Sequence, residues 1–319
     1  MRWRTFVGPD SSVPCVHDGT VYVVGLVVWA LNAADGFVRW TKPDIGHHGS
    51  PAASGDTVYL AGQSRYGGGR FFALDTADGR VRWRRRTPLP SLTQPTVADG
   101  LVHHVDSSRH LRTFDAATGR RRWRVKYRRS GANRAGPVLA DGTLYVVDDG
   151  GTVRALDPAT GAVRWQRPTS ARVPRTPLVH DGTLYLGGGQ LQEVYALDAA
   201  TGEQRWSAQP YLARTAFQST PAIHGDTLFI AGSDHLYALN ATTGEARWRV
   251  PADGGSIRSP VVADGKVYFG NRLGQVCAIS ADNGQVRWKA QAGDKLRSLV
   301  VAGGLVHVCS DDRLYTLDA

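Results

Sequence analysis

The sequence predicts an all-β protein, an eight-bladed β-propeller of four-stranded antiparallel blades. Three observations predict it: one segment recurs along the chain, each full copy ends in a tryptophan, and the first residues match the end of a copy. The composition agrees, since 37 glycines, nine tryptophans and one methionine among 319 residues indicate many short strands and tight turns.

The recurring segment appears seven times in full and once cut short. The full copies are VWALNAADGFVRW (28–40), FFALDTADGRVRW (71–83), LRTFDAATGRRRW (111–123), VRALDPATGAVRW (153–165), VYALDAATGEQRW (194–206), LYALNATTGEARW (236–248) and VCAISADNGQVRW (276–288). Their final tryptophans are 43, 40, 42, 41, 42 and 40 residues apart. This is the period of a four-stranded propeller blade.

Each repeat contains four strand signals, which we name A to D. In the second copy they are SPAAS, TVYLAG, FFALD and RVRWRR, with Gly-Asp between A and B and TADG between C and D. Gly and Asp occur where tight turns need a positive φ or a side-chain hydrogen bond to the backbone. The A–B and C–D turns therefore need no functional explanation.

The two ends of the chain are expected to share a blade. The eighth copy stops at LYTLDA (314–319) before its D strand, whereas residues 1–4 read MRWR and match the Arg-Trp of the other copies. An N-terminal strand that completes the last blade would close the fold. We therefore expect one domain of eight blades over residues 1–319.

Charge and cysteine content limit the possible functions. The net charge of +10 is compatible with nucleic acid, anionic lipid or an acidic protein as partner. Only five of the 38 cations are lysine, so a GC-rich genome is an equally open explanation. Cys15, Cys277 and Cys309 form no CxxC pair, and we predict neither a metal site nor a cofactor.

Neither an export signal nor a membrane span is apparent in the sequence. The N-terminus MRWRTFVGPD has no apolar core, and no apolar run reaches the roughly 18 residues that suggest a span. We expect a monomer that is cytoplasmic or is a soluble domain of a larger protein.

The stretch Ala-Leu-Asp-x-x-Thr-Gly-x-x-x-Trp, intact at 155–165 and 196–206, resembles the tryptophan-docking repeat of PQQ-type propeller proteins. The resemblance covers the whole chain and implies that each repeat tryptophan stacks between neighbouring blades. These are Trp3, Trp40, Trp83, Trp123, Trp165, Trp206, Trp248 and Trp288. Trp29 falls outside this register.

Three groups within this family suggest different functions. Quinoprotein dehydrogenases carry adjacent cysteines and a calcium-holding Glu, Asn and Asp set; this chain has no adjacent cysteine pair, so redox catalysis is disfavoured. The outer-membrane barrel-assembly lipoprotein is a similar scaffold. The phrase ADGTLYVVDDGGTVRALDPATG (140–161) is most similar to the C-terminal propellers of actinobacterial Ser/Thr kinases, which implies a sensing or docking domain.

The B–C loops and D-to-A crossovers, which we call the loop side, are long, irregular and cationic. Variable loops on one side of a repeat protein commonly form its binding surface. Aligning the crossovers on the residue that opens strand A predicts a ligand-binding channel mouth of His48, Gln94, Arg134, Arg175, Gln218, Arg258 and Arg297. Arginine forks suit an anionic small molecule or an acidic protein segment. Alternatively, each arginine pairs with a local carboxylate such as Asp44, Asp253 or Asp294.

The cationic run at 120–129 divides into two parts. Arg122 belongs to the repeat, because an arginine precedes every docking tryptophan, and we expect it to link blades. Strand alternation predicts that Arg121 shares the inward face of Trp123, where other blades have Val38, Val81, Val163 and Val286. The excess, Lys126, Arg128 and Arg129, forms a predicted basic patch.

The leading hypothesis is a non-catalytic propeller, a sensor or scaffold, that binds an anionic ligand or acidic partner through its loop side. One alternative is an enzyme with its site at the channel mouth, although no Ser-His-Asp set or carboxylate pair is evident. Another is nucleic-acid binding through the arginine-rich blades 2 and 3. His17, His180 and His224 share a repeat position but lie in separate blades, which disfavours zinc.

Overall fold

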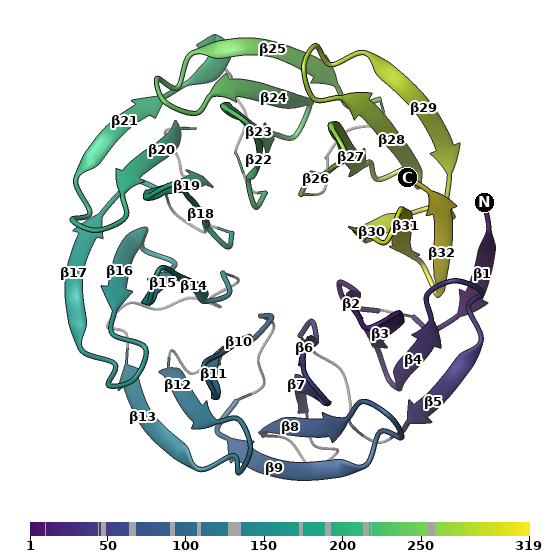
Figure 1. Cartoon of the computed structure of the whole chain (residues 1–319). Coiled ribbons are helices and arrows are strands. Elements are labelled where there is room, and N and C mark those ends of the chain that lie inside the picture. The colour runs from purple at the N-terminus through teal and green to yellow at the C-terminus, as the bar shows by residue number, and fades with distance from the viewer. Residues whose placement is uncertain are drawn as a thin grey trace. The chain divides into compact units, whose positions relative to one another are not determined.

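The computed structural model describes residues 1–9, 11–43, 45, 49–63, 68–89, 93–106, 110–126, 135–171, 175–188, 193–212, 217, 219–253 and 259–319 (Figure 1). Within these residues the chain forms eight four-stranded antiparallel sheets and one 3-10 turn, η1 (Pro210–Leu212), with no α-helix. The predicted all-β, eight-bladed class is confirmed. No helix in these ranges is long and apolar enough to cross a bilayer.

Backbone proximity groups the sheets into two compact units. The first contains Met1–Pro137, Ala159–Gly161 and Arg297–Ala319, and the second Val138–Pro158 and Ala162–Leu296. That all eight blades form one domain stays a prediction.

The first unit holds blades 1, 2, 3 and 8. Blade 1 is β2 (Cys15–His17), β3 (Thr20–Val24), β4 (Val28–Asn32) and β5 (Val38–Lys42). Blade 2 is β6 (Ala52–Ser54), β7 (Thr57–Gln63), β8 (Gly69–Asp75) and β9 (Val81–Thr87). Blade 3 is β10 (Thr96–Ala98), β11 (Leu101–Val105), β12 (His110–Asp115) and β13 (Arg121–Lys126). Blade 8 is β30 (Leu296–Ala302), β31 (Leu305–Ser310), β32 (Arg313–Asp318) and β1 (Trp3–Phe6).

The second unit holds blades 4 to 7. Blade 4 is β14 (Val138–Ala140), β15 (Thr143–Val147), β16 (Thr152–Leu156) and β17 (Val163–Pro168). Blade 5 is β18 (Leu178–His180), β19 (Thr183–Gly188), β20 (Glu193–Asp198) and β21 (Gln204–Ala208). Blade 6 is β22 (Ala222–His224), β23 (Thr227–Ala231), β24 (His235–Asn240) and β25 (Ala246–Pro251). Blade 7 is β26 (Val261–Ala263), β27 (Lys266–Gly270), β28 (Gln275–Ser280) and β29 (Val286–Gln291).

The N-terminal strand completes the last blade, as predicted. Strand β1 pairs antiparallel with β32, with Trp3 opposite Thr316 and Phe6 opposite Arg313. The order β1-β32-β31-β30 joins the two ends of the chain in one sheet (Figure 1).

Each docking tryptophan packs against an aromatic residue of strand B in its own blade, and all except Trp288 also contact a glycine of the next C–D turn. Trp83 lies 5.9 Å from Tyr59 between ring centroids, and its indole N–H donates to the Ala116 carbonyl at 2.8 Å. A Cβ on Gly119 would lie 2.5 Å from the Trp83 ring, and the φ of Gly119 is +66°. Only glycine fits there. The same glycine contact recurs at Gly36, Gly79, Gly161, Gly202, Gly244 and Gly284.

A β-bulge in strand D shows that the face predicted for Arg121 was wrong. We call the arginine that precedes each docking tryptophan the template arginine; in blade 3 it is Arg122. In blade 3, Thr113 pairs with Trp123 but Phe114 pairs with Arg121, so Arg122 is the extra residue. The bulge breaks the alternation on which the prediction rested. Arg121 is therefore exposed, and so are its counterparts Val38, Val81, Val163 and Val286.

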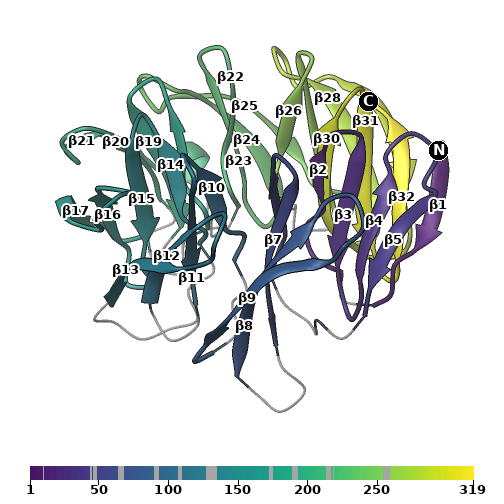
Figure 2. The same cartoon turned by 60° about the horizontal axis from the view of Figure 1, so that its bottom comes forward.

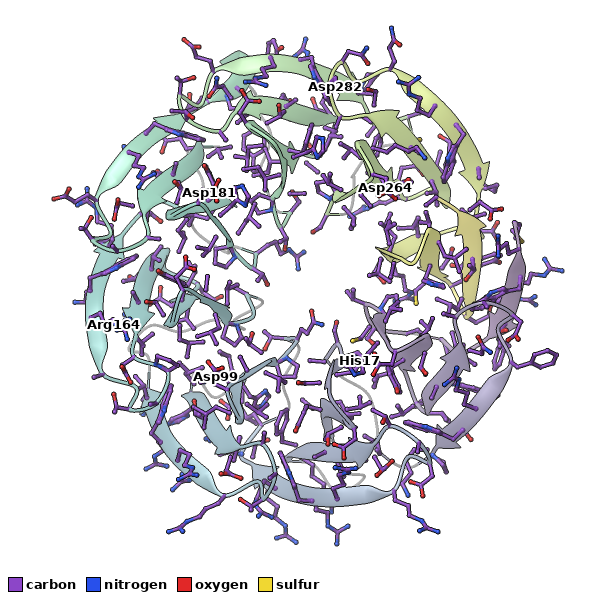
Figure 3. All side chains as sticks on the ribbon, viewed as in Figure 1. His17, Asp99, Arg164, Asp181, Asp264 and Asp282 are labelled. Carbon is purple, nitrogen blue, oxygen red and sulfur yellow. The ribbon has the colours of Figure 1, made fainter. Side chains whose placement is uncertain are left out.

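The template arginine acts within its own blade, which corrects the expected link between blades. Arg122 binds Asp115 at 2.6 Å, and Arg164, labelled in Figure 3, binds Asp157 at 3.1 Å. The motif aspartate of strand C thus pairs with the arginine seven residues later. This contact stabilises the C–D hairpin.

The order of Gly and Asp in the A–B turn decides what the aspartate does. In the Asp-Gly turns the aspartate has a positive φ, as at Asp99 and Asp181, labelled in Figure 3. Blade 2 has the reverse order: Gly55 has the positive φ, and Asp56 instead binds Arg82 at 2.7 Å. Blade 6 repeats this with Gly225 and the Asp226–Arg247 pair.

Candidate functional site

The structure describes only part of the predicted channel mouth and basic patch. His48, Arg134, Gln218 and Arg258 of the mouth, and Arg128 and Arg129 of the patch, lie outside the described residues. Gln94 is described and donates from its side-chain amide to the Pro51 carbonyl of the preceding blade at 2.9 Å. Arg175 and Arg297 are half-buried and engage other groups of the chain. Their convergence on one ligand stays a prediction.

On the loop side of the second unit, Tyr211 adopts a strained backbone conformation. It lies in η1, between blades 5 and 6, with φ 56° and ψ 25°. Among the described non-glycine residues with positive φ, all the others are turn aspartates. An aromatic residue in the left-handed region costs on the order of 1–3 kcal/mol and needs surrounding contacts to hold it there. Its side chain is nevertheless 44% exposed.

Those contacts form what we call the Tyr211 cluster: Tyr211, Arg249, Tyr237, Asp234 and His235. The Arg249 guanidinium lies 4.7 Å from the centre of the Tyr211 ring, and the Tyr211 and Tyr237 rings are 6.1 Å apart. Asp234 accepts a hydrogen bond from the Tyr237 hydroxyl at 3.4 Å and lies 3.0 Å from His235 Nδ1. The cluster presents an exposed aromatic face and a positioned guanidinium.

Electrostatics keep Tyr237 a neutral hydrogen-bond donor. Burial, and then the charge of Asp234, raise the pKa of Tyr237 to about 12. The hydroxyl thus stays protonated across the physiological range. The cluster therefore contains hydrogen-bonding groups and a cation–π pair and no activated nucleophile.

A second polar group lies between blades 4 and 5 on the loop side. The Tyr195 hydroxyl donates to the Glu193 carboxylate, and Ser170 Oγ lies 2.5 Å from the same hydroxyl. Burial and the Glu193 hydrogen bond raise the pKa of Tyr195. Ser170 Oγ also donates to the Glu193 carboxylate at 3.3 Å, so the three side chains tie the blade 4 crossover to β20.

The outer strands β9 and β13 carry surplus cations, which we call the arginine edge: Arg84, Arg86, Arg121, Arg124 and Lys126. All five are exposed, and none has an ion pair within the described parts of the chain. Their neighbours differ, because Arg82 binds Asp56 and Asp75, and Arg85 donates to the Gly119 and Thr118 carbonyls at 2.7 Å. Lys126 is the only basic-patch residue that the structure describes.

A buried polar cluster in blade 3 was not predicted. His104 is fully buried, stacks on Phe71 at 4.5 Å and lies opposite Arg112, which pairs with buried Asp106. Burial, and then Arg112, lower the pKa of His104 to about 3. The sequence signal for this cluster was a pair of histidines in strand B, His103 and His104, followed by His110 and Arg112 in strand C. Because the cluster is sealed in the interface of blades 2 and 3, it offers no open binding site.

The described residues contain no group of three or more His, Cys, Asp or Glu side chains placed to hold a metal ion. His17 contacts the Gly55 carbonyl at 2.8 Å, and His180 lies 3.3 Å from Asp181, so both have local partners.

Trp29 also has a packing role. It is half-buried beside the apolar cluster that contains Val7, Leu31 and Leu314, between blades 1 and 8.

Comparison with known proteins gives one family match and several relatives. Residues 1–65, 42–190 and 126–319 match the family described as outer membrane protein assembly factor BamB. The Ser/Thr-protein kinase AfsK of Streptomyces coelicolor is 30% identical over 322 residues, 97% of this chain and 34% of the kinase. AfsK of Streptomyces griseus is 33% identical over 150 residues, 44% of this chain and 18% of the kinase. The chain thus spans about a third or less of these kinases.

Among solved structures, BamB from Moraxella catarrhalis has a TM-score of 0.79 at 20% identity. The superposition covers 98% of this chain and 97% of that one. At this identity the likeness shows the fold alone.

Proposed function

Because this chain belongs to the family described as outer membrane protein assembly factor BamB, we propose that it is a non-catalytic scaffold or sensor propeller that binds a protein partner. The kinase relatives support this, since the chain corresponds to only part of their length. A propeller within a larger signalling protein is suited to docking.

One observation carries the proposal: the strained, exposed Tyr211 stacked on Arg249. Backbone strain of this kind persists at binding and catalytic sites. Tyrosine and arginine are enriched among the residues that contribute most binding energy at interfaces. Tyr211 offers a rigid aromatic surface, and Arg249 offers N–H donors for a carboxylate of an acidic segment.

Catalysis at the channel mouth has less support. On the loop side, Ser170 contacts a Glu193 carboxylate that already accepts the Tyr195 hydrogen bond, and the Tyr237–Asp234–His235 group contains no serine, cysteine or lysine nucleophile. An enzyme with its site at the channel mouth stays a prediction, since four of the seven predicted mouth residues lie outside the described ranges.

The proposal is tested by site-specific photo-crosslinking in the native host. A photoreactive phenylalanine analogue at position 211 should capture one discrete protein. The same analogue at Phe37, an exposed aromatic residue of the blade 1 C–D turn, is the control and should not capture it. Equal capture from both positions would count against the proposal.

Affinity measurements with the captured partner then show whether Tyr211 and Arg249 contribute to binding or only lie near the bound partner. Tyr211→Ala and Arg249→Gln should each weaken binding at least about tenfold, the effect of losing a central interface residue. Phe37→Ala should leave the affinity unchanged. Unchanged binding by both cluster variants would overturn the proposed site.

A further inference from the structure

The outer edges of β9 and β13 have a free row of backbone groups. The sheet orders β6-β7-β8-β9 and β10-β11-β12-β13 place both strands at the ends of their sheets, as Figures 1 and 2 show. Within the described residues, no other backbone segment hydrogen-bonds to their second edge. Such an edge can pair with another strand.

Arg84 and Arg86 belong to this outward row. The Arg84 carbonyl accepts a hydrogen bond from the side chain of Arg85 at 2.8 Å, so it points away from β8. Outward and inward backbone groups alternate along an antiparallel strand, which gives Arg86 the same direction. A carbonyl has two lone pairs and can accept a further N–H. Arg124 and Lys126 occupy the equivalent positions of β13, one and three residues after Trp123.

The side chains of the same residues are surplus cations. Arg84, Arg86, Arg124 and Lys126 are exposed and have no carboxylate partner in the described ranges. Alternate residues of a strand repeat every ~6.6 Å, and carboxylates at alternate positions of an extended peptide repeat equally. An acidic strand in register would pair each carboxylate with a cation.

We propose that the arginine edge binds an extended, acidic segment of a partner protein, which adds to β9 or β13 as a fifth strand. The main chain supplies hydrogen bonds, and the cations select the charge of the guest strand. A second copy of this chain is disfavoured, because β9 against β9 would place arginine opposite arginine. This surface is separate from the Tyr211 cluster, so the inference goes beyond the proposed function.

The charge component is tested with a peptide of alternating Glu and Thr, about ten residues long, titrated calorimetrically. Arg84→Gln, Arg86→Gln, Arg124→Gln and Lys126→Gln together should weaken binding at least about tenfold. The control is Arg39→Gln, Arg167→Gln, Arg272→Gln and Arg287→Gln, which removes four exposed cations from other blades. It should change affinity less than about twofold, and circular dichroism verifies that both variants fold.

The backbone component is tested with a second peptide in which proline replaces the threonines. Proline fixes φ at about −65°, which disfavours the extended strand conformation that pairing requires, so this peptide should bind at least about tenfold more weakly. Hydrogen exchange should show slower exchange of the outward amides of β9 or β13 when the Glu-Thr peptide is bound.

Three outcomes would overturn the inference. The first is that the fourfold edge variant and the wild type bind the Glu-Thr peptide equally. The second is that the proline peptide binds as tightly as the Glu-Thr peptide. The third is that duplex DNA displaces the bound peptide at a lower concentration than free peptide does. The last outcome would assign the surface to nucleic acid. Tyr211→Ala should not affect peptide binding, so failure here is distinguishable from failure of the proposed function.

Discussion

The outer strands of blades 2 and 3 and those of blades 5 and 6 follow one repeat but differ in chemistry. β9 reads VRWRRRT and β13 reads RRWRVK, whereas β21 reads QRWSA and β25 reads ARWRVP. In both regions the template arginine binds an aspartate of its own blade, as Arg82 does with Asp75 and Arg205 with Asp198. Blades 2 and 3 add the five exposed cations of the arginine edge, which have no such partner among the described residues, whereas blade 6 adds one, Arg249, and blade 5 adds none.

One position shows the difference most directly. Arg84 of blade 2 and Arg249 of blade 6 each follow a docking tryptophan. Both are exposed, but the Arg249 guanidinium stacks on the Tyr211 ring, whereas Arg84 has neither an aromatic nor a carboxylate partner among the described residues. The two arginines share one repeat position, so their neighbouring side chains, and not the repeat, distinguish the two surfaces.

The largest expected effect concerns the shared scaffold and should be equal in both regions. Gly119→Ala in blade 3 and Gly202→Ala in blade 5 should each lower the free energy of unfolding by about 3 kcal/mol. The new Cβ would have a positive φ and overlap Trp83 or Trp165. The control Gly100→Ala has a similar φ but open space and should cost about 1 kcal/mol. Urea unfolding measures these free energies. If all three substitutions lowered the free energy of unfolding equally, overlap with the tryptophan ring would not be the cause of the loss.

The next largest effect is a loss of stability at low pH, which we expect to be greater for the first unit than for the second. Strand B has His103 and His307 in the first unit where the second has Tyr or Phe, and burial lowers the pKa of each histidine from 6.5 to about 4. The unfolded chain binds these protons near pH 6.5 and the folded chain only near pH 4, so stability present above pH 6.5 is lost as pH falls through this window. Each should contribute about 2 kcal/mol of destabilisation at pH 5.

Restoring the repeat in blade 3 tests this assignment. His103 Nδ1 lies 2.7 Å from Thr113 Oγ1, and His307 and Thr316 form the same pair at 2.8 Å, whereas blades with Tyr or Phe have alanine in place of the threonine. His103→Tyr with Thr113→Ala should reduce the loss of stability between pH 7 and pH 5, measured by urea unfolding. An unchanged pH dependence would exclude His103 as its source.

The smallest expected effect concerns the strain at Tyr211. Tyr211→Asn should change the free energy of unfolding by less than about 1 kcal/mol, because relief of the left-handed strain offsets the lost ring contacts. The same substitution should weaken binding of the crosslinked partner. A large loss of stability in thermal unfolding would show that Tyr211 is a packing residue.

Sequence reasoning predicted most of the fold because the repeat encodes it. Tryptophan spacing, the Gly and Asp turns and the MRWR start determined the blades and the pairing of β1 with β32. The bulge at Arg122 was missed because simple alternation does not reveal an extra residue.

The candidate sites were less predictable. The strain of Tyr211 depends on a backbone conformation that the stretch SAQPYLARTAFQ does not encode locally. The opposition of His104 and Arg112 depends on strand register. The arginine-rich D strands were visible in the sequence, but their division into paired and surplus cations required the positions of Asp56, Asp75 and Asp115.

The most direct test compares surplus with template arginines at equal charge. The Glu-Thr peptide is titrated against Arg84→Gln with Arg124→Gln, and against Arg82→Gln with Arg122→Gln. Because Arg82 and Arg122 are occupied by aspartates, we expect the first variant to lose most of its affinity and the second to retain it. Equal losses in the two variants would contradict the division of the outer strands into scaffold and binding residues.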